Sequence, residues 1–195
     1  MNVVVCTCPE YAPKTLGLVF QTLAQCSGSL GLVHVAGLSG KYDRCGEMAF
    51  VPEYVDAGLT APVFAMHDTC LVEDSARFSQ YLSAVEQLLN EGYDFVGLRP
   101  DISMCHMGGF SASFINKIRT VMVRDFACLS KRDRIAREIS GWLPSLAEKY
   151  GSVLVQEKWR GKTYVKHLDA RLWERVWSCG LVKYTRYKVV DEVPV

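Results

Sequence analysis

The sequence predicts one α/β domain in which a mostly parallel, mixed sheet is flanked by helices. The chain has 195 residues, 49% hydrophobic and 22% charged, which is close to the average for a globular domain with a buried core. Short apolar runs alternate with amphipathic segments of helical length, the order typical of parallel sheets. No apolar run approaches the ~20 residues that cross a bilayer. We therefore expect no membrane span.

The N-terminal residues predict a strand, a helix and a second strand. Residues 3–7 are an apolar run typical of a buried strand. Pro13 favours the start of a helix, because proline fits the first helical turn. The apolar positions of this helix recur at helical spacing: Leu16, Val19, Phe20, Leu23 and Ala24. The helix is expected to stop at Ser27 and Gly28, with a strand at residues 32–36 and a loop at residues 37–46.

The next unit repeats this order. Residues 63–66 predict a strand that runs into polar residues, and Asp74 or Ser75 can cap the helix that follows. The apolar face of that helix is Phe78, Tyr81, Leu82, Val85, Leu88 and Leu89. Gly92 closes the helix, and residues 95–98 predict another strand.

The second half predicts further helices and strands. Residues 107–110 indicate a flexible break, after which Ser111 or Ser113 caps a helix. Another helix is expected over residues 135–146, kinked or split by Pro144. The remaining elements are strands at residues 153–155 and 164–165, and a short helix capped by Asp169 that carries Leu172, Trp173, Val176 and Trp177.

The cysteine content, the N-terminal residues and the charge distribution indicate what kind of protein this is. The 8 cysteines are scattered through apolar segments, which favours free thiols over a disulfide framework. The start of the chain lacks the basic and apolar regions of a signal peptide, so we expect a cytoplasmic protein. Residues 1–116 carry 5 Lys and Arg against 12 Asp and Glu, which gives a net charge of −7. Residues 117–195 carry 17 Lys and Arg against 9 Asp and Glu, which gives a net charge of +8. Such an asymmetry indicates either a phosphate-rich partner or a solvated basic face.

The segment His67-Asp68-Thr69 is the strongest candidate for a site. A carboxylate and an imidazole at the carboxyl end of a parallel strand can hold a divalent cation beside a bound phosphate. The alternative is that Asp68 caps or turns the chain after the strand. The sequence leaves both roles open.

Four segments together resemble the nucleotide-sugar glycosyltransferases of the A-type, Rossmann-like fold, particularly the broad family-2-like group. These are residues 6–11, residues 62–72 with Asp68 at the acidic position of the motif, residues 93–97, and the glycine-containing residues 107–115. The resemblance covers about 120 residues. It implies a single domain over residues 1–195, with a nucleotide-sugar-binding half at 1–100 and an acceptor-binding half at 101–195.

The resemblance also implies roles for individual residues. The expected donor-binding residues are Thr7, Pro9, Glu10, Tyr11, His67, Asp68 and Thr69. The expected acceptor-binding residues are Met107, Gly108, Gly109, Phe110 and Ser111. Glu138 is the expected catalytic base, with Asp133 and Asp125 behind it, and Asp68 and His167 are the expected ligands of Mn or Mg. The alternative for Glu138 is a solvated surface ion pair, which is the commoner role of a glutamate flanked by arginines, and the alternative for His167 is a half-buried strand histidine.

Three functions are therefore compared. The first is transfer of a hexosyl or pentosyl group from a nucleoside diphosphate to an acceptor hydroxyl, with a modified DNA base as one acceptor, since the basic half also carries four tryptophans: Trp142, Trp159, Trp173 and Trp177. The second is a non-catalytic nucleic-acid-binding protein on the same scaffold. The third is a thiol-dependent enzyme that pairs a cysteine with His34, His67, His106 or His167.

Overall fold

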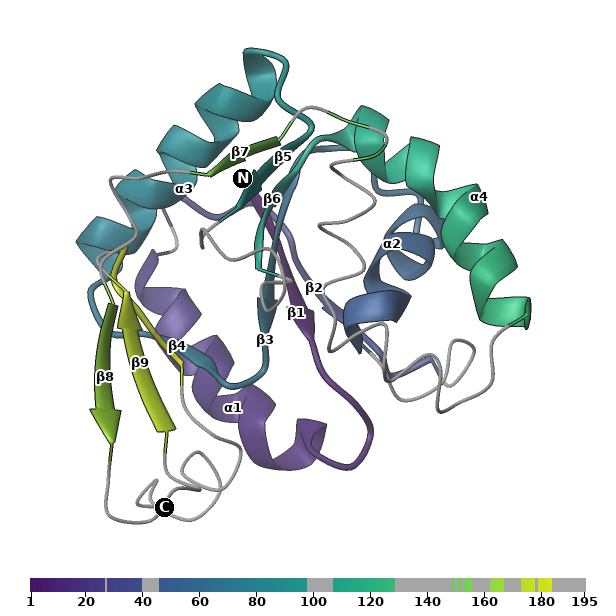
Figure 1. The fold of residues 1–195 in the computed structure, drawn as a ribbon. Helices are drawn as coiled ribbons and strands as arrows, with labels where there is room; N and C mark the ends of the chain where they lie inside the picture. Colours follow the sequence, from purple (N-terminus) through teal and green to yellow (C-terminus); the bar gives the residue numbers. More distant parts are fainter. Residues whose placement is uncertain are drawn as a thin grey trace.

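In the computed structural model, the described residues form two β-sheets and four α-helices (Figure 1). The structure describes residues 1–26, 28–39, 46–97, 107–128, 149, 151, 153–155, 162–166, 173–177 and 179–183. In these residues no helix is both long and apolar enough to span a bilayer.

The larger sheet is mixed and mostly parallel, as the sequence predicts. Its strands are β1 (Asn2–Cys6), β2 (Val33–Ala36), β3 (Val63–His67), β5 (Phe95–Gly97), β6 (Gly108–Phe110) and β7 (Val153–Val155). Their order is β2-β1-β3-β6-β5-β7. The pairs β1–β2, β1–β3 and β5–β7 are parallel, whereas β6 runs antiparallel to both of its neighbours.

Helices cover both faces of this sheet (Figure 1). They are α1 (Ala12–Leu23), α2 (Gly46–Asp56), α3 (Ser75–Asn90) and α4 (Ala112–Cys128), with a short 3-10 turn, η1 (Ala24–Cys26), after α1. Because side chains alternate along a strand, Val3 and Val5 of β1 pack into a core with α1 and α3, and Val4 packs into a second core with α2 and α4. The sheet is thus the middle of three layers.

The smaller sheet is antiparallel and stands beside α1 (Figure 1). It contains β4 (Cys70–Val72), β8 (Lys162–Lys166), β9 (Trp173–Trp177) and β10 (Leu181–Lys183), in the order β4-β10-β9-β8. Gly180 joins it to the start of α3, because its carbonyl accepts hydrogen bonds from the backbone N–H of Glu73 (2.9 Å) and Asp74 (3.2 Å). Gly180 has a φ of 86°, and a side chain there would overlap the Asp74 carbonyl.

Both sheets join early and late parts of the chain. Strands β6 and β7 pair with strands of the first hundred residues, and β10 pairs with β4. The boundary expected between residues 1–100 and 101–195 therefore runs through hydrogen-bonded sheets.

Three predicted helix starts are confirmed. Pro13 lies in the first turn of α1. The Asp74 carboxylate accepts a hydrogen bond from the Arg77 N–H at 3.0 Å, and the Ser111 hydroxyl accepts one from the Phe114 N–H at 3.1 Å. Each cap satisfies a backbone donor that has no partner within its helix.

Two expectations about secondary structure are wrong, and one helix was not predicted. Residues 107–110 are not a flexible break but contain β6, whose glycines are required because a methyl group at Gly109 would overlap Val85 of α3. Residues 173–177 form strand β9 and not a helix, since they pair with β8 and β10. Helix α2, which contains Pro52, was not expected. The helix predicted over residues 135–146 lies outside the described residues.

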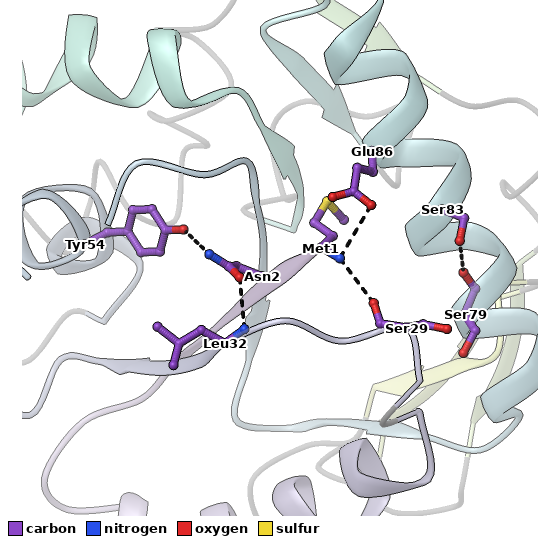
Figure 2. A network of polar contacts seen from close by, with 8 residues as sticks. All are labelled: Met1, Asn2, Ser29, Leu32, Tyr54, Ser79, Ser83 and Glu86. Atoms are coloured by element: carbon purple, nitrogen blue, oxygen red, sulfur yellow. Dashed lines mark hydrogen bonds and ion pairs between the residues drawn. The ribbon is translucent and has the colours of Figure 1, made fainter. Parts of the chain in front are cut away.

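The amino end of β1 is fixed by polar contacts to several elements (Figure 2). Asn2 donates from Nδ2 to the buried Tyr54 hydroxyl of α2 (2.8 Å) and accepts at Oδ1 from the Leu32 N–H (2.9 Å). The Met1 amino group contacts the Ser29 carbonyl (3.2 Å) and the Glu86 carboxylate of α3 (3.5 Å). These contacts fix the register of β1 at its amino end, whereas Asp68 lies at the carboxyl end of the neighbouring strand β3.

Candidate functional site

The centre of the larger sheet contains a change in winding direction. The chain passes from β1 through α1 to β2 on one side of β1, and then through α2 to β3 on its other side. Helices α1 and α2 consequently lie on opposite faces of the sheet (Figure 1). Open α/β sheets bind ligands at the carboxyl ends of strands at such a topological switch point. Here that point lies between β1 and β3.

Asp68 and Thr7 meet at this switch point. The Thr7 hydroxyl donates to Asp68 Oδ2 at 2.7 Å, and the Thr15 hydroxyl of α1 lies 3.2 Å from the same oxygen. The Asp68 N–H also donates to the Cys6 carbonyl at 3.0 Å. Only 1% of Asp68 is exposed, so its carboxylate ties the exit of β3 to the turn between β1 and α1.

The turn between β1 and α1 has a buried and an exposed part. Thr7 and Cys8 are buried, whereas Pro9 and Glu10 are exposed. Tyr11 is half-buried, and its N–H donates to the Cys8 carbonyl at 3.1 Å. Of the predicted donor-binding residues, Pro9, Glu10 and Tyr11 therefore offer surface to a ligand, while Thr7 supports the turn from inside.

The exit of β3 is completed by a lysine that the sequence did not single out. Lys183 of β10 donates from Nζ to the Thr69 hydroxyl at 3.2 Å. Lys183 is half-buried and Thr69 is buried. The two residues are 114 positions apart, and the register that pairs Lys183 with Cys70 brings them together. His67 closes β3 and is half-buried.

A second carboxylate stabilises the exit of β2. Glu53 of α2 accepts hydrogen bonds from the Gly37 N–H at 2.8 Å and from the Ser39 hydroxyl at 2.5 Å. Burial lowers the pKa of His34 in β2, and the negative charge of Glu53 opposes that shift. Sequence reasoning missed Glu53, because it assigned no structure to the segment around it.

The predicted acceptor residues do not gather at this edge. Strand β6 begins beside the carboxyl half of β3 and runs antiparallel to it, so Phe110 lies level with the first residue of β3. Met107 is on the Asp68 side, where its Sδ lies 3.2 Å from Cys70 Sγ. Ser111 caps α4 at the opposite edge and donates to Asp94 at 3.0 Å. Gly108, Gly109 and Phe110 are buried within the sheet.

Several predicted residues lie outside the part of the chain that the structure describes. These are the two expected catalytic acids, Glu138 and Asp133, and the expected metal ligand His167. Asp125 lies within the bounds of α4.

Metal binding and thiol catalysis both depend on how histidine, cysteine and carboxylate side chains are grouped and exposed. Among the residues that the structure describes, no group of three or more His, Cys, Asp and Glu side chains could hold a metal ion. Cys6, Cys8, Cys26, Cys70 and Cys179 are buried. Burial also raises the pKa of Cys26, whereas a nucleophilic cysteine needs a lowered pKa and access to its substrate.

Comparisons of the chain with protein-family models, with curated proteins and with solved structures find no match.

Proposed function

We propose that the protein transfers a sugar from a nucleoside diphosphate to an acceptor hydroxyl, with the donor bound where β1 and β3 end. The observation that carries this proposal is the contact between Thr7 and Asp68 at the topological switch point. The same two residues belong to the segments that resemble nucleotide-sugar glycosyltransferases. The mixed sheet, with one antiparallel strand among parallel ones, is compatible with the A-type fold of that family.

In the proposed reaction the bond between the anomeric carbon and the diphosphate oxygen breaks, and its electron pair stays on the diphosphate. The acceptor oxygen forms the new bond to the anomeric carbon and loses its proton to a carboxylate. Glu138 is the proposed base, with Asp133 as the alternative. A base of this kind works best when burial brings its pKa toward neutrality. The residues at the β1–β3 edge bind and orient the donor.

We assign Asp68 a positioning role in this site. Its carboxylate is buried, and Oδ2 already has hydroxyl groups at 2.7 and 3.2 Å. The described residues contain no group of three or more His, Cys, Asp and Glu side chains that could hold a metal ion. A divalent cation needs several oxygen ligands, and His167, the other expected ligand, lies outside the described residues. Within the fold, Asp68 holds the turn that carries Pro9, Glu10 and Tyr11.

The acceptor is proposed to be a hydroxyl group on a modified base in DNA. The observation that favours a DNA acceptor is the uneven charge of the chain: the net charge is +8 over residues 117–195 and −7 over residues 1–116. Phosphate contacts of this kind release counterions, so affinity for an oligonucleotide falls steeply with salt. A salt-independent affinity would exclude a DNA acceptor. Oligonucleotide binding without any donor binding would instead favour a non-catalytic nucleic-acid-binding protein.

A thermal-shift panel of nucleoside diphosphates and their sugar conjugates tests the donor site. A ligand at 100 times its Kd stabilises the native state by about 2.7 kcal/mol. For a chain of this length that corresponds to a rise in Tm of roughly 5–10 °C. The panel is followed by a turnover assay, in which the hydrolysed or transferred sugar is measured. If no nucleotide raises Tm and none is turned over, the proposed function is wrong.

A matched pair of variants locates the donor. Thr7→Val removes the hydroxyl that contacts Asp68, and Thr120→Val removes an exposed hydroxyl on α4. We expect the first variant to weaken nucleotide binding and the second to leave it unchanged. Equal affinities in both variants would place the donor elsewhere.

A further inference from the structure

Lys183 brings a positive charge to the exit of β3. Lys183 is half-buried, and its ammonium group donates to the Thr69 hydroxyl at 3.2 Å. Thr69 directly follows Asp68, so the ammonium group stands beside the turn that leaves the switch point. Lys183 is held in place by the ladder between β10 and β4, in which it pairs with Cys70.

The contact that the structure describes for the Lys183 ammonium group is with a neutral partner, the Thr69 hydroxyl. An ammonium group has three N–H donors, and a neutral hydroxyl takes up one of them. None of the ion pairs that the structure describes includes Lys183. The nearby carboxylate of Asp68 has its Oδ2 directed at Thr7 and Thr15. A partly desolvated cation is stabilised by an anion that supplies both charge and acceptor oxygens.

We propose that Lys183 binds the diphosphate of the donor, in the place of a divalent cation. This inference rests on the proposed function and specifies the chemistry of its donor site. Lysine is suited to the task, because its compact charge binds phosphate oxygens without the geometric demands of a guanidinium group. When the sugar leaves, the electron pair that stays on the diphosphate oxygen is stabilised by Lys183.

Two residues then have different roles where β1 and β3 end. Asp68 is a positioning residue that acts inside the fold through Thr7 and Thr15. Lys183 is a ligand-binding residue that faces the departing group. The site is therefore expected to bind a nucleoside diphosphate in EDTA as tightly as in Mg.

Calorimetric titration provides the first test. The probes are inorganic pyrophosphate and the nucleoside diphosphate with the largest thermal shift, each in EDTA and in Mg. We compare the wild type with Lys183→Gln, with Lys183→Arg, which keeps the charge, and with Lys117→Gln, which removes an exposed lysine on α4. Lys183→Gln should weaken diphosphate binding about 10- to 100-fold, the effect of losing one charged hydrogen bond. Lys183→Arg should restore much of the affinity, and Lys117→Gln should not change it.

A second measurement uses the wild-type protein and does not depend on the folding of a variant. Reductive methylation of lysines is followed by mass spectrometry, with and without saturating nucleoside diphosphate. The ligand should protect Lys183 and leave Lys117 unprotected.

The outcomes separate the two proposals. If nucleoside diphosphates bind only with Mg, or if they bind without protecting Lys183, the assignment of Lys183 is overturned and the proposed function stands. If neither nucleoside diphosphates nor pyrophosphate bind the wild type under any condition, the proposed function itself fails. Binding in EDTA with protection of Lys183 supports both.

Discussion

Replacement of Asp68 distinguishes a structural carboxylate from one kept only for catalysis. In Asp68→Ala, the hydroxyls of Thr7 and Thr15 lose an acceptor at 2.7 and 3.2 Å. Each hydrogen bond to a charged group contributes about 1.5–3 kcal/mol. The Thr15 hydroxyl also has the Tyr11 carbonyl at 3.0 Å as an acceptor, so the contact of Thr15 with Asp68 contributes less to stability than that of Thr7. We expect the free energy of unfolding to fall by about 2–4 kcal/mol in total.

The sign of the change in the free energy of unfolding separates the two roles of Asp68. Residues kept for function often reduce stability, so their replacement commonly leaves the free energy of unfolding unchanged or raises it. Asp68→Asn retains the shape of the side chain and one acceptor oxygen. We therefore expect its free energy of unfolding to fall by roughly half as much as that of Asp68→Ala.

Urea-induced unfolding, followed by circular dichroism, measures these differences at a constant m value. Asp56→Ala is the matched control, because Asp56 forms a surface ion pair with Arg119 at 2.7 Å. Such pairs contribute about 0–1 kcal/mol. If Asp68→Ala unfolds at the same or a higher urea concentration than the wild type, the positioning role of Asp68 is refuted.

Three further predictions concern the packing and titration of the sheet. Gly109→Ala forces a methyl group against Val85 and should cost about 1–3 kcal/mol, measured by urea unfolding; wild-type stability would mean that α3 can move away from β6. Asn2→Ala removes the Nδ2 donor to the buried Tyr54 hydroxyl and should cost about 1–3 kcal/mol, whereas an unchanged Tm would show that water replaces it. The pKa of His34 is lowered from 6.5 by burial, so the unfolded chain binds more protons and stability should fall as pH drops below about 6.5. A His34→Gln variant whose Tm declines as steeply as the wild type between pH 7.5 and 5 would assign the decline to another group.

Strands β1, β2, β3 and β5 and helices α1 and α3 were predictable because their local pattern and their packing agree. The first four residues of β3 are an uninterrupted apolar run, and α3 has both a cap at Asp74 and apolar positions at helical spacing. In contrast, α2 has Pro52 in its interior and a weak apolar pattern, so its helical state depends on packing against β2 and α4. Local sequence carries little of that information.

Two elements show how one pattern can suit two structures. The adjacent residues Gly108 and Gly109 are typical of a loop, but here α3 leaves no room for a side chain at Gly109. Trp173, Val176 and Trp177 have helical spacing, and Trp173, Arg175 and Trp177 also alternate as in a strand. The pairing of β9 with β8 and β10 decides between them.

The candidate site was predictable in part, for a similar reason. Thr7 and Asp68 each follow an apolar strand, and the carboxyl ends of neighbouring parallel strands meet at one edge. Lys183 belongs to a short antiparallel strand from a distant part of the chain. No spacing rule connects it to Thr69, so only the folded structure reveals that contact.

The ladder between β4 and β10 has a consequence for the order of folding. It brings together residues 114 positions apart, and closing a loop of that length costs on the order of 4 kcal/mol of chain entropy. Contacts of such high contact order form late, after the local units around β1 and β3 have condensed. A nascent chain would therefore acquire Asp68 and its threonines early in synthesis, and would gain the lysine at the same edge only once residue 183 had left the ribosome.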